Sequence, residues 1–410
     1  MTTLSRVETI GTTPAPPWPQ GYRCAAWAAA IKKAGVNDIA LLVADAPVSA
    51  AAVFTKNLVA AAPIGVSRDH LALSRGQARA LLINSGCANA ATGEEGVLRA
   101  RRSTAAVAQA LAIDSAAVLV NSTGVIGVPL PIDKIERAIP SLVASLASGS
   151  CEPFARAIMT TDTRPKWSSR TIRVMHDGVD HEYRVTGVAK GAGMIHPNMA
   201  TMIAVIATDA PLAPTVLDGV LRDAVEGSFH RISIDGDTST NDSVFAFAHR
   251  PSGGGGAIPI EPVRDAFREV AADLAQLIVR DGEGFERGIE VSAVHAASQH
   301  DALTVARTVA MSLLVRTAVT GGDPNWGRIL AAAGRAGVAF DPNRIRVSAG
   351  GTLLFADGRP AEGNLADIRE AFTADTVRIE IDLASGPHSD RFWSCGLTTR
   401  YVELNADYTT

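Results

Sequence analysis

The sequence predicts a mixed α/β fold, a layered α+β sandwich. Two observations support this: short apolar runs typical of buried strands occur throughout the chain, and longer segments of helical periodicity lie between them. Hydrophobic residues make up 47% of the 410 residues and aromatic residues only 5%, so aliphatic side chains must build the core. A chain of this length forms roughly two to three domains or one large intertwined unit.

In the first half of the chain, residues 1–20 are polar and Pro-rich and predict a loose leader. Apolar runs predict buried strands at 39–44 and 80–83, alternating residues predict strands at 171–175 and 182–188, and another apolar run covers 202–207. A helix over 94–111 would place Val97, Val107 and Leu111 on one face. Pro131 suits the first turn of a helix to about 147, where its missing N–H is not needed.

In the second half, the clearest amphipathic helix covers 262–280, where apolar residues recur at helical spacing: Val263, Phe267, Val270, Leu274 and Ile278. Four glycines at 253–256 predict a surface turn. The remaining pattern predicts helices at 213–226 and near 300–318, and strands at 244–249, 289–296, 344–348, 376–383 and 400–405.

Charge and cysteine usage limit the class of protein. The formal net charge is -4, which gives no reason to expect nucleic acid or an anionic membrane as a partner. No apolar stretch reaches the roughly 20 residues of a transmembrane helix, and the N-terminus lacks the signal-peptide pattern. The four cysteines have no metal-ligand spacing and predict buried free thiols in a reducing compartment. We therefore expect a cytoplasmic protein without a metal.

Three clusters of small polar residues and glycine stand beside apolar runs: NSGCANAATG at 84–93, NSTGVIG at 121–127 and SIDGDTSTND at 233–242. Hydroxyls and glycine amides at strand ends suit close approach to a ligand. The same residues also form ordinary turns, and the pattern alone does not separate the two interpretations. Walker A, HExxH, CxxC and GxSxG motifs are absent.

The stretch 190–210, KGAGMIHPNMATMIAVIATDA, is the most unusual. A Gly-containing loop leads to Thr201, and an apolar strand follows this residue. A hydroxyl at the mouth of a buried strand is well placed to act as a nucleophile. A Thr that begins a strand is more commonly a β-branched residue in a sheet, so the pattern alone leaves both roles open.

Several segments together carry a resemblance over nearly the whole chain. They are VFTKNLVAAAP at 53–63, the cluster at 84–93, STGVIG at 122–127, TTDTRPK at 160–166, KGAGMI and MATM within 190–202, DGDTSTND at 235–242, GEG at 282–284, GDPNWGRI at 322–329 and NADYTT at 405–410. On these segments the chain resembles the ornithine acetyltransferase family of arginine biosynthesis, also called bifunctional glutamate N-acetyltransferase.

The resemblance implies a precursor that cuts itself between Ala200 and Thr201. It implies an α chain of residues 1–200, a β chain of residues 201–410 and an α2β2 heterotetramer. The implied fold is a layered sandwich related to N-terminal-nucleophile enzymes. The implied reaction moves acetyl from N2-acetylornithine to glutamate without a cofactor, with acetyl-CoA as a possible second donor.

The resemblance also implies the site residues. Thr201 is the nucleophile, and the Thr123 side chain and the Gly124 N–H stabilise the oxyanion. The substrate-binding positions are Thr161, Lys190, Thr201, Glu283, Asn405 and Thr410, although Thr160 and Thr163 are also open as the contact in TTDT. No metal ligand is implied.

The chain departs from the family pattern at positions that bear on substrate identity: GEGFER at 282–287, MSLLVR at 311–316, the bulky RFW at 391–393 with Gly396 before Leu397-Thr398, and His230 before Arg231. Three alternatives therefore stay open. One is a paralogous acyltransferase of secondary metabolism. Another is an N-terminal-nucleophile amidase or aminopeptidase that passes the acyl group to water. The third is a catalytically silent binding protein.

Overall fold

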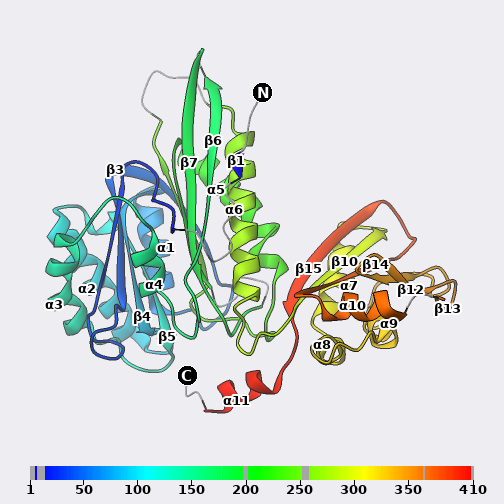
Figure 1. The fold of residues 1–410 in the computed structure, drawn as a ribbon. Coiled ribbons are helices and arrows are strands. Elements are labelled where there is room, and N and C mark those ends of the chain that lie inside the picture. The colour runs from blue at the N-terminus through cyan, green and yellow to red at the C-terminus, as the bar shows by residue number, and fades with distance from the viewer. Residues whose placement is uncertain are drawn as a thin grey trace. The chain divides into compact units, whose positions relative to one another are not determined.

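A computed structural model describes residues 5–6, 14–176, 178–196, 202–251, 258–362 and 365–407. The chain forms two compact units (Figure 1). The first comprises Met1–His230 and Asp237–Ile278, and the second comprises Arg231–Gly236 and Val279–Thr409. The cut between residues 200 and 201 that the resemblance implies would fall within the sequence of the first unit, so the implied α and β chains do not coincide with the two compact units.

Within the described residues, the first unit contains one nine-stranded sheet in the order β1-β6-β7-β8-β9-β3-β4-β5, with β2 paired to β3. The strands are β1 (Ser5–Arg6), β2 (Tyr22–Trp27), β3 (Ile39–Phe54), β4 (Gln77–Cys87), β5 (Val118–Val125), β6 (Lys166–His176), β7 (Val179–Lys190), β8 (Ile203–Pro211) and β9 (Ser243–His249). The helices are α1 (Ala62–Leu73), α2 (Gly93–Leu111), α3 (Ile132–Ala144), α4 (Glu152–Ala157), α5 (Pro214–Glu226) and α6 (Glu261–Val279), with short 3-10 turns at Ser115–Ala117 and Phe229–Arg231.

The long strand β3 belongs to both halves of this sheet. Its residues 39–43 pair with β2 and β4, and its residues 49–54 pair with β9. The register with β4 shifts between Val43 and Val48, where the strand bends. Such irregularities let one strand pass from one sheet layer to the next. The two halves therefore face each other as layers of a sandwich.

Apolar residues on both faces of β3 hold the layers together. On one face, Ala40 and Leu42 join a core with strands of both halves and with Phe154 of α4. On the other face, Ile39 and Leu41 pack with α2 and α3 (Figure 1). Helix α6 lies against β7 at Gly187, where an added Cβ would stand 2.7 Å from Val270. The mixed, layered α/β fold expected from the sequence is confirmed.

Helix α1 covers the open edge of β5. The Ser67 hydroxyl donates to the Val120 carbonyl at 2.6 Å and accepts from the Val120 N–H at 2.8 Å. The His70 ring lies 2.8 Å from the Val118 carbonyl through Nδ1. These side chains satisfy backbone groups that an uncovered edge strand would leave open for pairing with another chain. The edge that carries Thr123 is therefore fixed.

The N-terminal segment differs from the loose leader expected for 1–20. Ser5–Arg6 pair with β6, and Trp18 is buried against Phe154 with ring centroids 5.7 Å apart. The Trp18 N–H donates to the Gly149 carbonyl at 2.9 Å. The polar and Pro-rich composition suggested a leader because a single large buried residue, Trp18, hardly changes the average composition of the segment. Strand β2 was also missed, since its arginine interrupts a short apolar run.

Helix α2 has the expected bounds, and Val107 and Leu111 pack on its core face as expected, but Val97 does not. Val97 is 37% exposed, whereas Val107 is fully buried. The buried side consists mainly of small residues: Gly96, Ala100, Ser103, Thr104, Val107 and Ala108. Hydrophobicity alone misplaces the face because close packing against α1 and α3 selects small side chains rather than large ones.

The second unit contains a six-stranded sheet in the order β13-β12-β11-β14-β10-β15 among the described residues. The strands are β10 (Gly288–Ala296), β11 (Arg346–Ala349), β12 (Thr352–Ala356), β13 (Arg359–Pro360), β14 (Thr376–Asp382) and β15 (His388–Cys395). The helices are α7 (Gln299–Ala310), α8 (Leu313–Thr320), α9 (Trp326–Gly334), α10 (Leu365–Thr373) and α11 (Thr399–Asp407). Strands β10 and β14 are parallel, and their apolar residues pack with α7 and α9.

Two expectations for this unit were wrong. The single helix near 300–318 is two helices, α7 and α8, separated at Met311 and Ser312 and bent by 56°. The segment 400–405, expected as a strand, lies in α11. The Thr398 hydroxyl accepts from the Tyr401 N–H at 3.2 Å, and such capping starts a helix.

Other expectations have mixed outcomes. The four cysteines are buried and free, as expected. The glycines at 253–256 lie outside the described residues. Over the described ranges, no single helix is long and apolar enough to cross a membrane, and α7 and α8 meet that test only as a bent pair.

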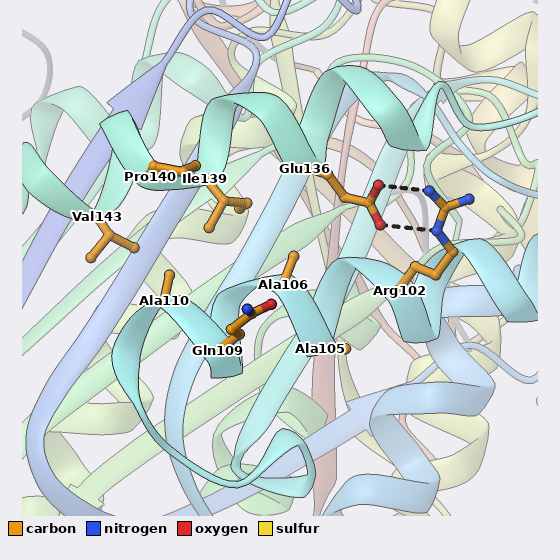
Figure 2. A pocket seen from close by; sticks show the side chains of 9 residues that line it. All are labelled: Arg102, Ala105, Ala106, Gln109, Ala110, Glu136, Ile139, Pro140 and Val143. Atoms are coloured by element: carbon orange, nitrogen blue, oxygen red, sulfur yellow. Dashed lines mark hydrogen bonds and ion pairs between the residues drawn. The ribbon is translucent and has the colours of Figure 1, made fainter.

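A surface pocket opens between α2 and α3 (Figure 2). Arg102 of α2 and Glu136 of α3 form an ion pair there, with nitrogen–oxygen distances of 2.9 and 2.6 Å. The other lining residues are Ala105, Ala106, Gln109, Ala110, Ile139, Pro140 and Val143. None of them is a residue that the sequence proposes for the site.

Replacement of Trp18 tests whether the N-terminal segment belongs to the core. Trp18→Ala should lower the free energy of unfolding by about 3–5 kcal/mol, because it removes a buried aromatic ring. Trp27→Ala is the matched control, since Trp27 is 39% exposed and should cost much less. Urea denaturation followed by circular dichroism measures both, and equal losses would contradict the placement of Trp18.

Candidate functional site

The polar clusters predicted at strand ends meet in one buried network of the first unit. The Ser122 hydroxyl at the end of β5 donates to Asn84 Oδ1 of β4 at 2.6 Å. Asn241, just before β9, donates through Nδ2 to the Ser122 carbonyl at 2.8 Å. Asn121 donates in return to the Asn241 carbonyl at 3.1 Å. Asn84, Asn121, Ser122 and Asn241 are all at most 4% exposed, so these clusters are more than surface turns.

Two glycines allow β4 and β5 to approach closely beside this network. Gly86 and Gly124 are partners in the parallel register, with φ values of +101° and +130°. A Cβ on Gly124 would stand 2.3 Å from the carbonyl carbon of Gly86. Only glycine fits at position 124, both for its backbone conformation and for the space around it. This close contact fixes the backbone next to Thr123.

Lys190 and Thr123 are brought together across the sandwich. Lys190 ends β7 and is 3% exposed, while Thr123 lies in β5 and is 4% exposed. Lys190 Nζ lies 3.4 Å from Thr123 Oγ1. The sequence separates these residues by 67 positions, and the folded halves of the sheet place an ammonium beside a hydroxyl.

Asp162 anchors this ammonium. Its carboxylate lies 2.6 Å from Lys166 Nζ and 3.9 Å from Lys190 Nζ. It also accepts the N–H groups of Thr160 and Gly191, at 3.0 and 2.6 Å. Burial by itself would raise the pKa of Asp162, but the two ammonium groups and the hydrogen bonds hold this pKa well below its usual range. Asp162 is therefore ionised, and the two buried lysines have a fixed counter-charge.

Lys32 adds a third cation on the same side. Its Nζ donates to the Met159 carbonyl, and its side chain lies beside Gly86. Burial lowers the pKa of Lys32; the carboxylates of Asp38 and Asp162 oppose that shift, and the charge of Lys190 adds to it. Three lysines, Lys32, Lys166 and Lys190, thus lie near two buried aspartates, Asp38 and Asp162, and the excess of positive charge favours an anionic ligand.

The chain that follows the proposed nucleophile is held by the start of β9. The Met202 N–H donates to Asp242 Oδ1 at 3.1 Å, and the Ser243 N–H donates to the Met202 carbonyl at 3.1 Å. The next residue, Ile203, is the register partner of Lys190. Ala200 and Thr201 themselves lie outside the described residues.

Glu283 and Asn405 meet in the second unit. Asn405 Nδ2 donates to Glu283 Oε2 at 2.8 Å. Gly284 adopts φ +70°, and a Cβ there would stand 2.5 Å from the Tyr401 nitrogen, so the turn at 283–284 packs directly on α11. Thr410 lies outside the described residues.

Thr161 precedes Asp162 and is half-buried, as is Thr160, whereas Thr163 is exposed. The backbone of Thr160 is already bound to Asp162. Which hydroxyl contacts a substrate therefore stays a prediction.

Several residues at which the chain departs from the family pattern pack inside the second unit. Phe392 and Trp393 are buried in β15, and the Arg391 guanidinium lies 4.9 Å from the Trp393 ring centroid. Arg287, in GEGFER, donates to the Thr320 carbonyl at 2.7 Å. These bulky residues pack within the unit.

Over the described ranges, no three His, Cys, Asp or Glu side chains gather as metal ligands.

Pattern reasoning missed Asp162, Lys166, Lys32 and Asp242 as parts of the site. A signal existed for the first two, since Asp162 and Lys166 are charged residues four positions apart beside an expected strand. Asp242 belongs to the polar cluster at 233–242, but nothing in that pattern distinguishes it from its neighbours. Lys32 gave no signal, because only the fold brings it beside β4.

Known proteins were compared with this chain. The model of the ArgJ family matches residues 23–410. The arginine biosynthesis bifunctional protein ArgJ of Parasynechococcus marenigrum is 42% identical over 397 residues, covering 96% of this chain and 94% of the relative. The protein of the same name from Methylococcus capsulatus is 43% identical over 396 residues, covering 95% of each chain.

Solved structures are also similar. A crystal structure of arginine biosynthesis bifunctional protein argJ from Bacillus halodurans is 33% identical with a TM-score of 0.46, covering 49% of this chain and 96% of that one. Ornithine acetyltransferase from Mycobacterium tuberculosis, complexed with ornithine, is 36% identical with a TM-score of 0.39, covering 48% and 98%.

Substitution of Gly124 tests the close contact of β4 and β5. Gly124→Ala should strongly destabilise the protein, because the added methyl group would collide with the Gly86 backbone. Gly127→Ala is the matched control: Gly127 also has a positive φ, of +79°, but nothing lies within 4 Å of an added Cβ. It should cost only about 1–2 kcal/mol of backbone strain. Thermal unfolding distinguishes the two, and a stable Gly124→Ala protein would refute the contact.

Substitution of Asp162 tests the buried charges. Asp162→Asn should cost about 3–5 kcal/mol at pH 7, since it leaves buried ammonium groups without their counter-charge. The folded pKa of Asp162 lies below the unfolded value of about 3.9, so its contribution is complete above about pH 4 and is lost as the pH falls through the folded pKa. The stability difference between wild type and variant should therefore narrow in acid.

The control for this variant is Asp45→Asn, which removes the exposed pair with Arg23 and should cost at most about 1 kcal/mol. Urea titrations at several pH values measure these differences. A gap between wild type and Asp162→Asn that is small at pH 7, or that widens in acid, would be incompatible with an ionised Asp162.

Proposed function

This chain belongs to the ArgJ family, and we propose that it transfers an acetyl group from N2-acetylornithine to glutamate through an acetyl-Thr201 intermediate. The observation that carries the proposal is the convergence of Lys190, Thr123 and Met202. Met202 follows Thr201 directly, its neighbour Ile203 pairs with Lys190, and Lys190 reaches Thr123. This meeting of three strand ends next to Met202 supports the proposal that Thr201 is the nucleophile.

The proposed nucleophile needs a base, because a threonine hydroxyl attacks weakly at neutral pH. Attack of the Thr201 hydroxyl on the Ala200 carbonyl carbon gives an ester by an N→O acyl shift, and water then cleaves the ester. The cut frees the α-amine of Thr201, whose unperturbed pKa is roughly 8. A base of this strength suits catalysis near neutral pH, so no histidine is required.

In acetyl transfer, the Thr201 oxygen forms a bond to the acetyl carbon and ornithine leaves with its amine. The Thr123 hydroxyl and the Gly124 N–H are the proposed donors to the tetrahedral oxyanion. Loss of one such donor typically costs roughly 3–4 kcal/mol of transition-state stabilisation. The amine of glutamate then attacks the acetyl ester. One amide is exchanged for another, so the reaction is nearly balanced in energy and we propose no cofactor.

The charges near Thr123 suit substrates that carry an α-carboxylate. Lys190, which lies 3.9 Å from Asp162, is the proposed partner of that carboxylate, and Thr161 is proposed as a further binding residue. Glu283, whose carboxylate is held by Asn405, is proposed for the side-chain ammonium of ornithine. Thr410 completes the proposed binding residues.

We further propose that the two cut chains stay together as an α2β2 heterotetramer in the cytoplasm. The relatives are named bifunctional, and acetyl-CoA is proposed as a second donor for this chain. Formation of N-acetylglutamate from acetyl-CoA and glutamate would establish that second activity.

Thr201→Ala is the decisive variant. Wild type should separate on a denaturing gel into two fragments of about equal size, and Thr201→Ala should remain one chain of 42.7 kDa without acetyl transfer. Thr201→Ser keeps a hydroxyl on Cβ and should still be cut. N-acetylglutamate formed from N2-acetylornithine and glutamate measures turnover.

Two outcomes would contradict the proposal. An uncut wild-type polypeptide with full activity would exclude the α-amine as the base. Release of free acetate that does not depend on glutamate would favour an amidase or aminopeptidase instead.

A further inference from the structure

Lys32 is a cation beside the site that the proposed reaction does not yet use. It lies half-buried in the turn between β2 and β3, and its Nζ donates to the Met159 carbonyl. An ammonium group has three N–H donors, and no second acceptor lies within hydrogen-bond distance of this one among the described residues. Holding a charge partly out of water is costly, so the position of this ammonium requires an explanation.

The buried carboxylate of Asp38 fixes the turn that carries Lys32. Asp38 is 0% exposed, and it accepts the N–H groups of Ala29, Ile31 and Lys32 at 2.7, 2.6 and 2.9 Å. The Ser85 N–H of β4 donates to the Asp38 carbonyl at 2.8 Å. The backbone of Lys32 is therefore held beside the end of β4, and its side chain starts from a preorganised position.

The side chain of Lys32 contacts two segments that the proposed function assigns to the substrate. A Cβ on Gly86 would stand 2.8 Å from Lys32 Cγ, and Gly86 pairs in register with the glycine that follows Thr123. Met159, whose carbonyl accepts from Nζ, lies two residues before Thr161. Lys32 therefore lies between the proposed oxyanion strand and the proposed binding segment at 160–162.

The other two lysines of this cluster already have partners. Lys166 is fully buried and lies 2.6 Å from Asp162. Lys190 lies 3.9 Å from the same carboxylate and is the proposed partner of a substrate α-carboxylate. Burial and the charge of Lys190 both lower the pKa of Lys32, against the carboxylates of Asp38 and Asp162. An anion bound beside both Lys32 and Lys190 would relieve the repulsion between them.

The two proposed substrates differ in their number of carboxylates. N2-acetylornithine has one, whereas glutamate has an α- and a γ-carboxylate. Glu283 is proposed for the side-chain ammonium of ornithine, and its own carboxylate would repel a γ-carboxylate bound in the same place. The acceptor therefore requires a cation that the donor does not use.

We propose that Lys32 binds the γ-carboxylate of glutamate and thereby selects this dicarboxylate as the acyl acceptor, an inference that rests on the proposed function. The two remaining N–H groups of its ammonium donate to the carboxylate, while the third stays on the Met159 carbonyl. Lys190 holds the α-carboxylate of the same molecule, so two cations match two anions. Lys32 takes no part in bond making or breaking and acts on the choice of acceptor.

A structural role for Lys32 makes a different prediction. An ammonium that only held the Met159 carbonyl would position the segment at 160–162, and its loss would impair every acceptor alike. A cation for the γ-carboxylate matters only for acceptors that carry this group. Glutamine is the informative comparison, because it has the size of glutamate and a neutral amide in place of the γ-carboxylate.

The test is Lys32→Met, which keeps an unbranched stem against Gly86 but removes the charge. On protein isolated after self-cleavage, kcat/KM for glutamate should fall by about 10- to 100-fold, the usual worth of a hydrogen bond to a charged group. The value for glutamine should fall far less, so the preference for glutamate over glutamine should shrink. Lys33→Met is the matched control, since the neighbouring lysine is exposed and should leave this preference at the wild-type value.

The outcomes separate this inference from the proposed function. If wild type transfers acetyl to no amino-acid acceptor, the proposed function fails whatever Lys32 does. If wild type acetylates glutamate and folded Lys32→Met keeps the wild-type ratio of glutamate to glutamine, only the role of Lys32 is overturned.

Wild type alone serves if Lys32→Met fails to fold or to be cut. It should prefer glutamate over glutamine by at least about 10-fold in kcat/KM. Glutarate, which has both carboxylates but no amine, should compete with glutamate more strongly than pentanoate, which has one carboxylate. Equal use of glutamate and glutamine, or equal competition by the two acids, would overturn the role of Lys32.

Discussion

The carboxylate of Asp162 is the interaction on which the organisation of the site depends. It binds Lys166 at the start of β6, and it receives the Gly191 N–H just after β7. Desolvating an ion pair is expensive, and the cost is recovered only when further hydrogen bonds complete the geometry. Here the backbone N–H groups of Thr160 and Gly191 supply them. The position of Lys190, and through it the approach to Thr123, follows from this one buried charge.

Asp162 and Asp242 show how the surroundings of two buried carboxyl groups shift their pKa values in opposite directions. Both are buried, and both lie in the field of Lys190. Asp162 has a second ammonium and two N–H donors to its carboxylate, whereas at Asp242 the effect of burial on the pKa outweighs the N–H groups of Met202 and Ser239 and the charge of Lys190. Pairs of titratable groups with opposite shifts are characteristic of acid–base chemistry. The first group is the counter-charge of Lys166 and Lys190, and the second binds the N–H of Met202, the residue after the proposed nucleophile.

The sequence predicted the elements whose apolar pattern is continuous, such as α6 and the buried β8, because burial on one or both faces leaves a periodic trace. It failed where tertiary contacts decide. Trp18 is an isolated apolar residue in a polar segment, and α11 begins at a hydroxyl cap within an alternating pattern. For the site, periodicity located the polar strand ends, but the family resemblance was needed to single out Lys190 and Thr123. Asp242 lies in the polar cluster at 233–242, but its contact with the Met202 N–H depends on the fold and has no local trace in the sequence.

The sheet order has a consequence for a chain divided at 200. Strand β8 pairs on one side with β7, which precedes the cut, and β9 pairs with β3, which also precedes it. The two pieces would interleave across the central strands and remain one folding unit held by backbone hydrogen bonds. After unfolding, however, they would separate by diffusion, and recovery would require a bimolecular encounter that dilution slows. The mature protein would then persist because it opens slowly, and its refolding would not be an intramolecular process.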